Sequence, residues 1–138
     1  MINFFSEDVD FDLKGKLKTK KWITTIVNQE AQKTGEINII FCSDEYLLQV
    51  NKQYLDHDYY TDIITFNYNT DKVNGDLFIS IDRVFENAEK QNVPRGTEMQ
   101  RVIIHGILHL LGYNDKSPEE EKLIRQKEDK AIKIFNSI

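Results

Sequence analysis

Cysteine and proline are scarce in this chain: its 138 residues include one cysteine and two prolines. A single cysteine, Cys42, cannot form an internal disulfide. The chain is therefore unlike the small secreted domains that depend on disulfides, and we expect it in a reducing cytoplasm. Cys42 lies in an apolar stretch and is more typical of a small core side chain than of a metal ligand.

Long apolar runs are also missing, so we expect neither a membrane-spanning helix nor a membrane partner. The first ten residues, Met1 to Asp10, are acidic and do not resemble a signal peptide. A hydrophobic content of 40% and an aromatic content of 11% exclude a disordered chain. The length of 138 residues suits one domain with a single core, covering residues 1–138.

Positive charge is not in excess, because 18 Lys and Arg residues stand against 23 Asp and Glu residues, a formal net charge of −5. This balance argues against a general polyanion binder, and no DNA partner is expected. A contact with RNA would depend on a local basic patch or on a metal ion. The densest positive run is interpreted first as a solvated helix entrance and second as a phosphate contact. Its members are Lys14, Lys16, Lys18, Lys20 and Lys21.

The most informative stretch is His105-Gly106-Ile107-Leu108-His109-Leu110-Leu111-Gly112-Tyr113-Asn114-Asp115. Side chains four residues apart lie on one face of a helix, so the two imidazoles can reach one metal ion. Gly112 can adopt the positive φ that ends a helix, and the resulting turn would bring Asp115 toward both histidines. Two imidazoles and one carboxylate leave a fourth position open for water, as in catalytic zinc sites.

Two questions stay open for this stretch. The histidines could be two satisfied core side chains with no metal. If a metal is bound, its third ligand could be Asp115, Asn114 or water, and Asp115 is favoured because it is anionic and its spacing fits the turn. Gly106 stands where zinc proteases carry their glutamate base, so the sequence excludes a protease of that kind.

Three segments resemble the YbeY endoribonucleases, also called ribosomal RNA maturation factors. The first, His105 to Tyr113, matches the family pattern H-G-x-L-H-L-x-G-Y-D-H, whose last two residues are replaced here by Asn114 and Asp115. The second, Asn51 to Phe66, is similar to N-x2-Y-R-x2-D-x-P-T-D-V-L-S-F. The third, Gly75 to Ser80, is similar to G-D-I-x-I-S.

The second segment departs from the family pattern at two positions. Leu55 replaces an arginine that is thought to serve activity in the family, and Tyr60 replaces a proline. His57, the third histidine of the chain, is not spaced for the metal and is interpreted as an exposed loop residue. The matching positions are Asn51, Tyr54, Asp58, Thr61, Asp62 and Phe66.

The resemblance implies a single-strand endoribonuclease that acts in ribosomal RNA maturation and ribosome quality control through a metal-activated water. It implies one zinc ion per chain, held by His105, His109 and Asp115, and ribosomal RNA as partner, met within ribosomal particles. Asp62 or a phosphate oxygen of the substrate could accept the proton, or a metal-bound hydroxide could suffice without a separate base. Glu98, seven residues before His105, is a candidate hydrogen-bond partner of a ligand or substrate, or a carboxylate stabilised by the helix dipole. The alternatives are a non-catalytic ribosome-assembly factor with a structural zinc site and a hydrolase of a small substrate.

The apolar periodicity predicts the order β-α-β-α-β-β-α-α-α. This is an α+β domain with about five helices on a small mixed four-stranded sheet, and the metal motif lies on a central buried helix and the following turn. The predicted strands are 2–5, 36–42, 63–68 and 75–81, the last two joined by the turn 69–71. The first predicted helix is 19–34, ended by Gly35. The second reaches Tyr54, and Ser43 and Asp44 both offer N-cap oxygens to it. A third runs from its cap Asp82 to Lys90, and two more start at the capping boxes Thr97–Gln100 and Ser117–Glu120. Side chains expected to be buried include Ala31, Tyr54, Leu123 and Phe135.

Overall fold

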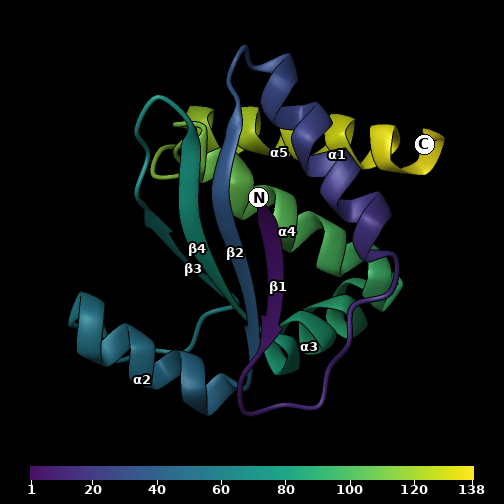
Figure 1. Cartoon of the computed structure of the whole chain (residues 1–138). Coiled ribbons are helices and arrows are strands. Elements are labelled where there is room, and N and C mark those ends of the chain that lie inside the picture. Colours follow the sequence, from purple (N-terminus) through teal and green to yellow (C-terminus); the bar gives the residue numbers. More distant parts are fainter.

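Four strands form one mixed sheet in the computed structural model, which describes residues 1–138. Their order across the sheet is β1 (Ile2–Ser6), β2 (Thr34–Cys42), β4 (Val73–Ser80) and β3 (Ile63–Asn67). Strands β1 and β4 both pair with β2 in parallel, and β3 pairs antiparallel with β4 (Figure 1). The predicted four-stranded mixed sheet and the predicted order of elements are therefore confirmed.

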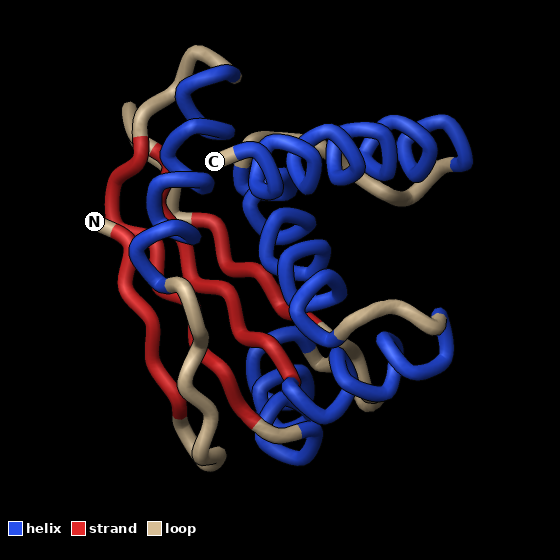
Figure 2. The backbone as a smooth tube through the Cα atoms, turned by 90° about the vertical axis from the view of Figure 1, so that its right-hand side faces the viewer, coloured by secondary structure: helices blue, strands red, loops and turns tan.

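Five helices complete the fold: α1 (Lys16–Gln29), α2 (Asp44–Leu55), α3 (Ile81–Gln91), α4 (Arg95–Leu110) and α5 (Pro118–Ser137). The main hydrophobic core lies between one face of the sheet and helices α1, α3, α4 and α5 (Figure 2). Helix α2 covers part of the opposite face, where a second, smaller cluster forms. None of the five helices combines the length and the apolar character that a membrane crossing requires.

Neighbouring residues of a strand contribute to different cores, because successive side chains point to opposite faces of the sheet. Ile39 and Phe41 of β2 belong to the main core, whereas Cys42 belongs to the cluster under α2. Cys42 is fully buried, and burial raises the pKa of its thiol to about 12. The prediction that Cys42 is a core residue is confirmed.

Helix α4 lies across the inner face of the sheet, and its close approach depends on Gly106. A Cβ atom at this position would come within 2.7 Å of both Ile63 Cδ1 and Leu77 Cδ2. On either side of Gly106, Ile103 and Ile107 are fully buried in the main core. The helix is therefore a fixed support for the side chains near its C-terminal end.

The predicted limits of the first helix are wrong. Helix α1 begins at Lys16 and ends at Gln29, because Ala31 takes a left-handed backbone conformation with φ of 59° and turns the chain. Ala31 is exposed rather than buried. Gly35, which was expected to end the helix, lies inside β2. The lysine run does mark the entrance of α1, where Lys18 lies over the Phe135 ring, 4.4 Å from its centroid.

Two predicted helix starts are also wrong. The side chain of Ser80, not that of Asp82, accepts a hydrogen bond from a first-turn backbone N–H of α3. Helix α4 starts at Arg95, directly after the extended residue Pro94, so Thr97 lies within the helix and cannot cap it. The capping box at the start of α5 is confirmed, with both reciprocal hydrogen bonds between Ser117 and Glu120 present.

Three of the side chains expected to be buried lie closer to solvent. Tyr54 is 63% exposed although its ring packs edge-on against Phe66, and Leu123 is 45% exposed. Phe135 is half-buried and packs edge-on against Trp22, with ring centroids 5.0 Å apart. These differences concern side chains near the surface, and they do not change the close packing of α4 against the sheet.

Candidate metal centre

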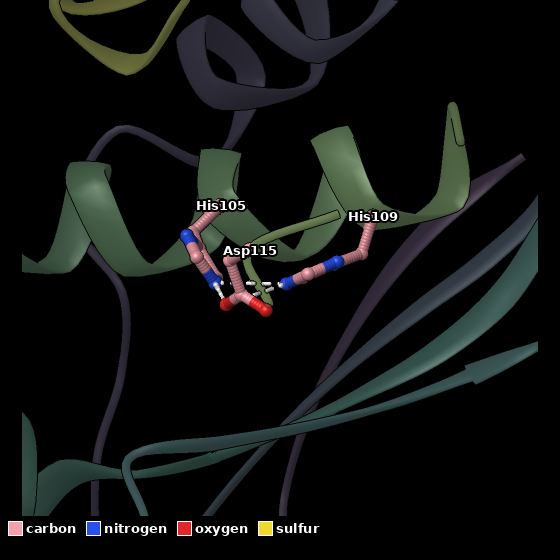
Figure 3. A group of neighbouring side chains, drawn as sticks. All are labelled: His105, His109 and Asp115. Atoms are coloured by element: carbon pink, nitrogen blue, oxygen red, sulfur yellow. Dashed lines mark hydrogen bonds and ion pairs between the residues drawn. The ribbon is translucent and has the colours of Figure 1, made fainter. Parts of the chain in front are cut away.

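The C-terminal end of α4 and the turn that follows it bring three polar side chains together (Figure 3). His105 and His109 lie one helical turn apart, and Gly112 reverses the chain with φ of 103°. Asp115 then returns to the histidines, with Oδ2 3.3 Å from Nε2 of each. The two Nε2 atoms are 2.9 Å apart. The three residues that the sequence singled out as ligands therefore form one cluster, in which one atom from each lies within 4.8 Å of the others.

The outer nitrogen of each imidazole has its own hydrogen-bond acceptor. His105 Nδ1 donates to Glu128 Oε2 at 2.6 Å, and His109 Nδ1 donates to the backbone oxygen of Tyr113 at 2.9 Å. Because a carboxylate and a carbonyl only accept, each Nδ1 must carry the hydrogen of its ring. In the neutral rings, both Nε2 lone pairs then point into the cluster, as metal-binding histidines require.

The cluster is suited to a cation. Two Nε2 lone pairs and the Asp115 carboxylate face one another, and no lysine or arginine is paired with any of the three. Zinc bonds of 2.0–2.2 Å in a tetrahedron separate ligand atoms by about 3.4 Å. The two distances to Asp115 already match this spacing, and the imidazoles would have to separate by about 0.5 Å. The residues present thus fit a divalent ion held by two imidazoles and one carboxylate.

The electrostatics around His105 also favour positive charge at this point. Burial by itself would lower the pKa of His105, but the hydrogen bond to Glu128 and the negative charges of Glu128, Asp115 and Asp62 raise it above its ordinary value. Three carboxyl groups thus act on one ring with the same sign. The same field would attract a metal ion.

Glu128 on α5 is the functional residue that the sequence analysis missed. Its side chain is 5% exposed, Oε2 accepts from His105, and Oε1 accepts from Arg101 Nη1 at 2.9 Å. The spacing along the chain could have indicated this, because Glu128 follows the buried Ile124 by four residues and precedes the buried Ala131 by three. Such spacing places Glu128 on the buried face of its helix. A carboxylate on the apolar face of a helix needs a partner.

Glu98 does not accept the hydrogen bond of a ligand histidine, because Glu128 has that role. Glu98 is nevertheless only 4% exposed, and its carboxylate has no hydrogen bond or ion pair within the chain. It lines a cavity of about 370 Å³ together with Asp62, His105, Asp115 and other residues. Burial raises the pKa of Glu98, an effect that nearby Arg101 opposes and the charge of Asp62 reinforces.

Asp62 directly precedes β3 and borders two cavities, the one beside Glu98 and a second of about 460 Å³. His105 and Asp115 also line both cavities. Burial raises the pKa of Asp62, although the charge of His105 and two backbone hydrogen bonds act against this. Asp62 is thus a carboxyl group beside the cluster with a pKa closer to neutrality than usual.

The remaining candidates occupy different places. Asn114 is exposed and does not belong to the cluster. His57 is exposed on the loop between α2 and β3, as predicted, but it lines the larger cavity. Leu55, at the end of α2, lines the same cavity.

Comparisons with known proteins agree over nearly the whole chain. Residues 2–136 match the family model described as endoribonuclease YbeY. A protein named endoribonuclease YbeY from Cytophaga hutchinsonii is 48% identical over 135 residues, 96% of this chain and 94% of its own length. One of the same name from Bacteroides thetaiotaomicron is 52% identical over 132 residues, 95% of this chain and 96% of its own. The solution structure of a Thermotoga maritima protein matches with a TM-score of 0.68 at 29% identity, covering 99% of this chain and 93% of that one.

Proposed function

Because the chain belongs to the endoribonuclease YbeY family, we propose that it cleaves single-stranded RNA by metal-dependent hydrolysis of phosphodiester bonds. We assign one zinc ion per chain to His105, His109 and Asp115. The observation that carries the proposal is the convergence of three acceptor atoms with no cationic side chain among them. An imidazole pair with one carboxylate is a donor set that suits zinc and leaves a position for water.

When bound, such an ion supplies Lewis-acid activation of water and neutralises phosphate charge. The chain supplies the proton acceptor. Asp62 borders both cavities beside the cluster, and its raised pKa makes it a stronger base than an ordinary aspartate. Glu98, with a raised pKa and no partner, can hold a proton for the leaving oxygen on the side of the smaller cavity. Gly106 cannot contribute to proton transfer.

The open cavities favour catalysis over a purely structural ion. A structural zinc site is closed by a fourth protein ligand. Here the cluster has three members, and two cavities of about 370 and 460 Å³ open on His105 and Asp115. These features support hydrolysis and argue against a non-catalytic assembly factor with a bracing zinc ion.

For the substrate, we propose ribosomal RNA, processed in ribosomal particles during maturation and quality control. The similarity of three segments to ribosomal RNA maturation factors supports this choice. We also propose a cytoplasmic location, in keeping with the buried thiol of Cys42.

The test is cleavage of a ribosomal RNA precursor by purified protein with and without a chelator. The parent protein should cut single-stranded regions, and chelation or His109→Ala should abolish cutting. The Asn114→Ala variant, which changes an exposed neighbour outside the cluster, is the matched control and should retain activity. Cleavage that persists both in chelator and in His109→Ala would refute the proposal, because it would come from another nuclease.

A further inference from the structure

A loop, residues 56–62, joins α2 to β3 (Figure 1). It borders the larger cavity at the candidate metal centre. Two of its side chains, His57 and Tyr59, line this cavity together with His105, His109 and Asp115. Neither ring has a role in the hydrolysis proposed above. Their position is nevertheless where a strand of RNA would pass if its phosphate reached the cluster.

No lysine or arginine lines this cavity. Its acidic members are Asp62 and Asp115, and Leu55 stands where the family pattern has an arginine. The lining therefore offers no cationic side chain to the phosphates of an RNA strand in this cavity. Within the cavity, the affinity for RNA must come from the metal ion and from uncharged contacts.

The uncharged contact that the cavity offers is aromatic. The rings of His57 and Tyr59 are stacked, with centroids 5.1 Å apart and planes inclined by 22°. The Tyr59 hydroxyl and His57 Nδ1 are hydrogen-bonded at 3.0 Å. Both side chains are exposed, Tyr59 by 54%. Exposed ring faces beside a cleft are the surfaces on which unpaired bases stack.

One buried residue holds both ring-bearing residues in place. Asn51 of α2 is 1% exposed, and its Nδ2 donates to the backbone oxygen of Tyr59 at 2.9 Å. The backbone oxygen of Asn51 accepts from the backbone N–H of His57 at 3.1 Å. Because the loop is anchored at two points, little ordering is required when a ligand binds to it.

We propose that His57 and Tyr59 form a stacking platform for the base of a nucleotide next to the scissile phosphate. This inference rests on the proposed function and deepens it, since it names the part of the RNA that the site recognises. Stacking uses the π face that every base has, so the platform accepts all four bases but requires them to be unpaired. It therefore selects single strands without a basic surface.

The test uses metal-loaded protein and a short single-stranded RNA that contains 2-aminopurine, whose fluorescence is quenched when it stacks. Stopped-flow measurements report binding before cleavage, and steady-state rates on the same RNA give KM and kcat. Tyr59→Leu removes the ring, Tyr59→Phe keeps it, and Tyr68→Leu is the matched control, because Tyr68 is 56% exposed but lines neither cavity.

Tyr59→Leu should lose most of the quenching and raise KM between about fivefold and about 100-fold, which is the range of one base stacked on one ring. Its kcat should stay within about twofold, because stacking is equal in the ground state and the transition state. Tyr59→Phe and Tyr68→Leu should behave like the parent. Equal quenching and equal KM in Tyr59→Leu and the parent would overturn the platform. A parent that binds with quenching but does not cleave would instead refute the proposed function, and a parent that does neither would refute both.

Salt dependence gives a second test that needs no variant. Each phosphate neutralised on a single strand contributes a slope of about 0.7 in a plot of log affinity against log salt. If the metal ion neutralises one phosphate of a trinucleotide and the remaining contacts are uncharged, a fourfold rise in salt should lower the affinity by about 2.6-fold, the value for one phosphate. A steeper loss would reveal lysine or arginine contacts and contradict the inference.

Discussion

At the scale of single residues, the Glu128 carboxylate has two hydrogen-bond partners, His105 on one oxygen and Arg101 on the other. The first contact fixes which nitrogen of His105 carries the hydrogen, and the second holds the carboxylate in position. Arg101 also contacts Asp129 at 2.8 Å, at the edge of the same group. The geometry of the proposed metal site therefore depends on α5 as well as on α4.

We predict that Glu128→Gln weakens zinc binding by roughly 10-fold to 100-fold, as loss of an outer-shell partner generally does. The amide keeps the shape of the side chain but removes the charge that supports His105. Competition with a chelating dye measures the dissociation constant. Asp129→Asn, which alters an exposed contact of the same Arg101, is the control and should bind zinc normally. Equal zinc affinity in the parent, Glu128→Gln and Asp129→Asn would show that Glu128 does not support the metal site.

The raised pKa of Glu98 predicts a pH-dependent loss of stability. Burial makes the folded protein bind this proton more tightly than the unfolded chain does, so stability falls as pH rises from the unfolded pKa through the folded pKa. Glu98→Gln should therefore raise the melting temperature of metal-free protein at neutral pH, with little difference at about pH 3. The exposed control Glu119→Gln should change neither value. A Glu98→Gln protein that is less stable than the parent at neutral pH would contradict this account.

At the scale of elements, the part of the site carried by α4 and its turn could be predicted from the sequence. The spacing of His105 and His109 and the turn at Gly112 are local properties of one helix and its end. The start of the same helix could not be predicted correctly from its capping-box pattern. Thr97 and Gln100 have suitable side chains, but Pro94 is extended and the helix begins at the next residue.

In the turn after α4, alanine substitutions at the adjacent residues Asn114 and Asp115 should have different effects on zinc binding. Asp115→Ala should lose most of the bound zinc, because Asp115 contacts both histidines, whereas Asn114→Ala should keep it. Asp115→His should retain zinc and move the pH–activity profile to lower pH, since a neutral ligand leaves one more unit of positive charge at the site. Metal analysis of the three variants and pH–rate profiles provide the check. Full occupancy in Asp115→Ala together with loss in Asn114→Ala would mean that the third ligand is misassigned.

Two glycines of α4 should respond in opposite directions to the same substitution. At Gly106, a Cβ would meet Ile63 and the fully buried Leu77, so Gly106→Ala should lower the free energy of unfolding by about 1–3 kcal/mol. At Gly96, nothing lies within 4 Å of an added Cβ, so Gly96→Ala should raise it by up to about 1 kcal/mol through helix propensity. Urea denaturation of metal-free protein measures both. A stabilising Gly106→Ala would mean that α4 does not approach the sheet so closely.

At the scale of the whole molecule, the parts of the site that the sequence could not reveal come from distant segments. Glu128 is 23 residues from His105, and the stacked rings of His57 and Tyr59 belong to the loop before β3. No periodicity relates these residues to the histidine pair. Glu128 reaches the histidine pair because α5 packs against α4. His57 and Tyr59 are held at the cavity because Asn51 anchors the loop before β3. The order of elements was predictable because each strand and helix has its own apolar pattern.

The central claim is that one metal ion held by His105, His109 and Asp115 makes this protein a ribonuclease. Titration of zinc into metal-free protein tests it most directly, with occupancy and the cleavage rate of a single-stranded RNA measured in the same samples. The rate should be zero without metal, rise in proportion to occupancy and level off at one ion per chain, and Asp115→Ala should show neither binding nor cleavage. Cleavage that is already complete in the metal-free protein, or that stays at zero when the site is full, would contradict the account.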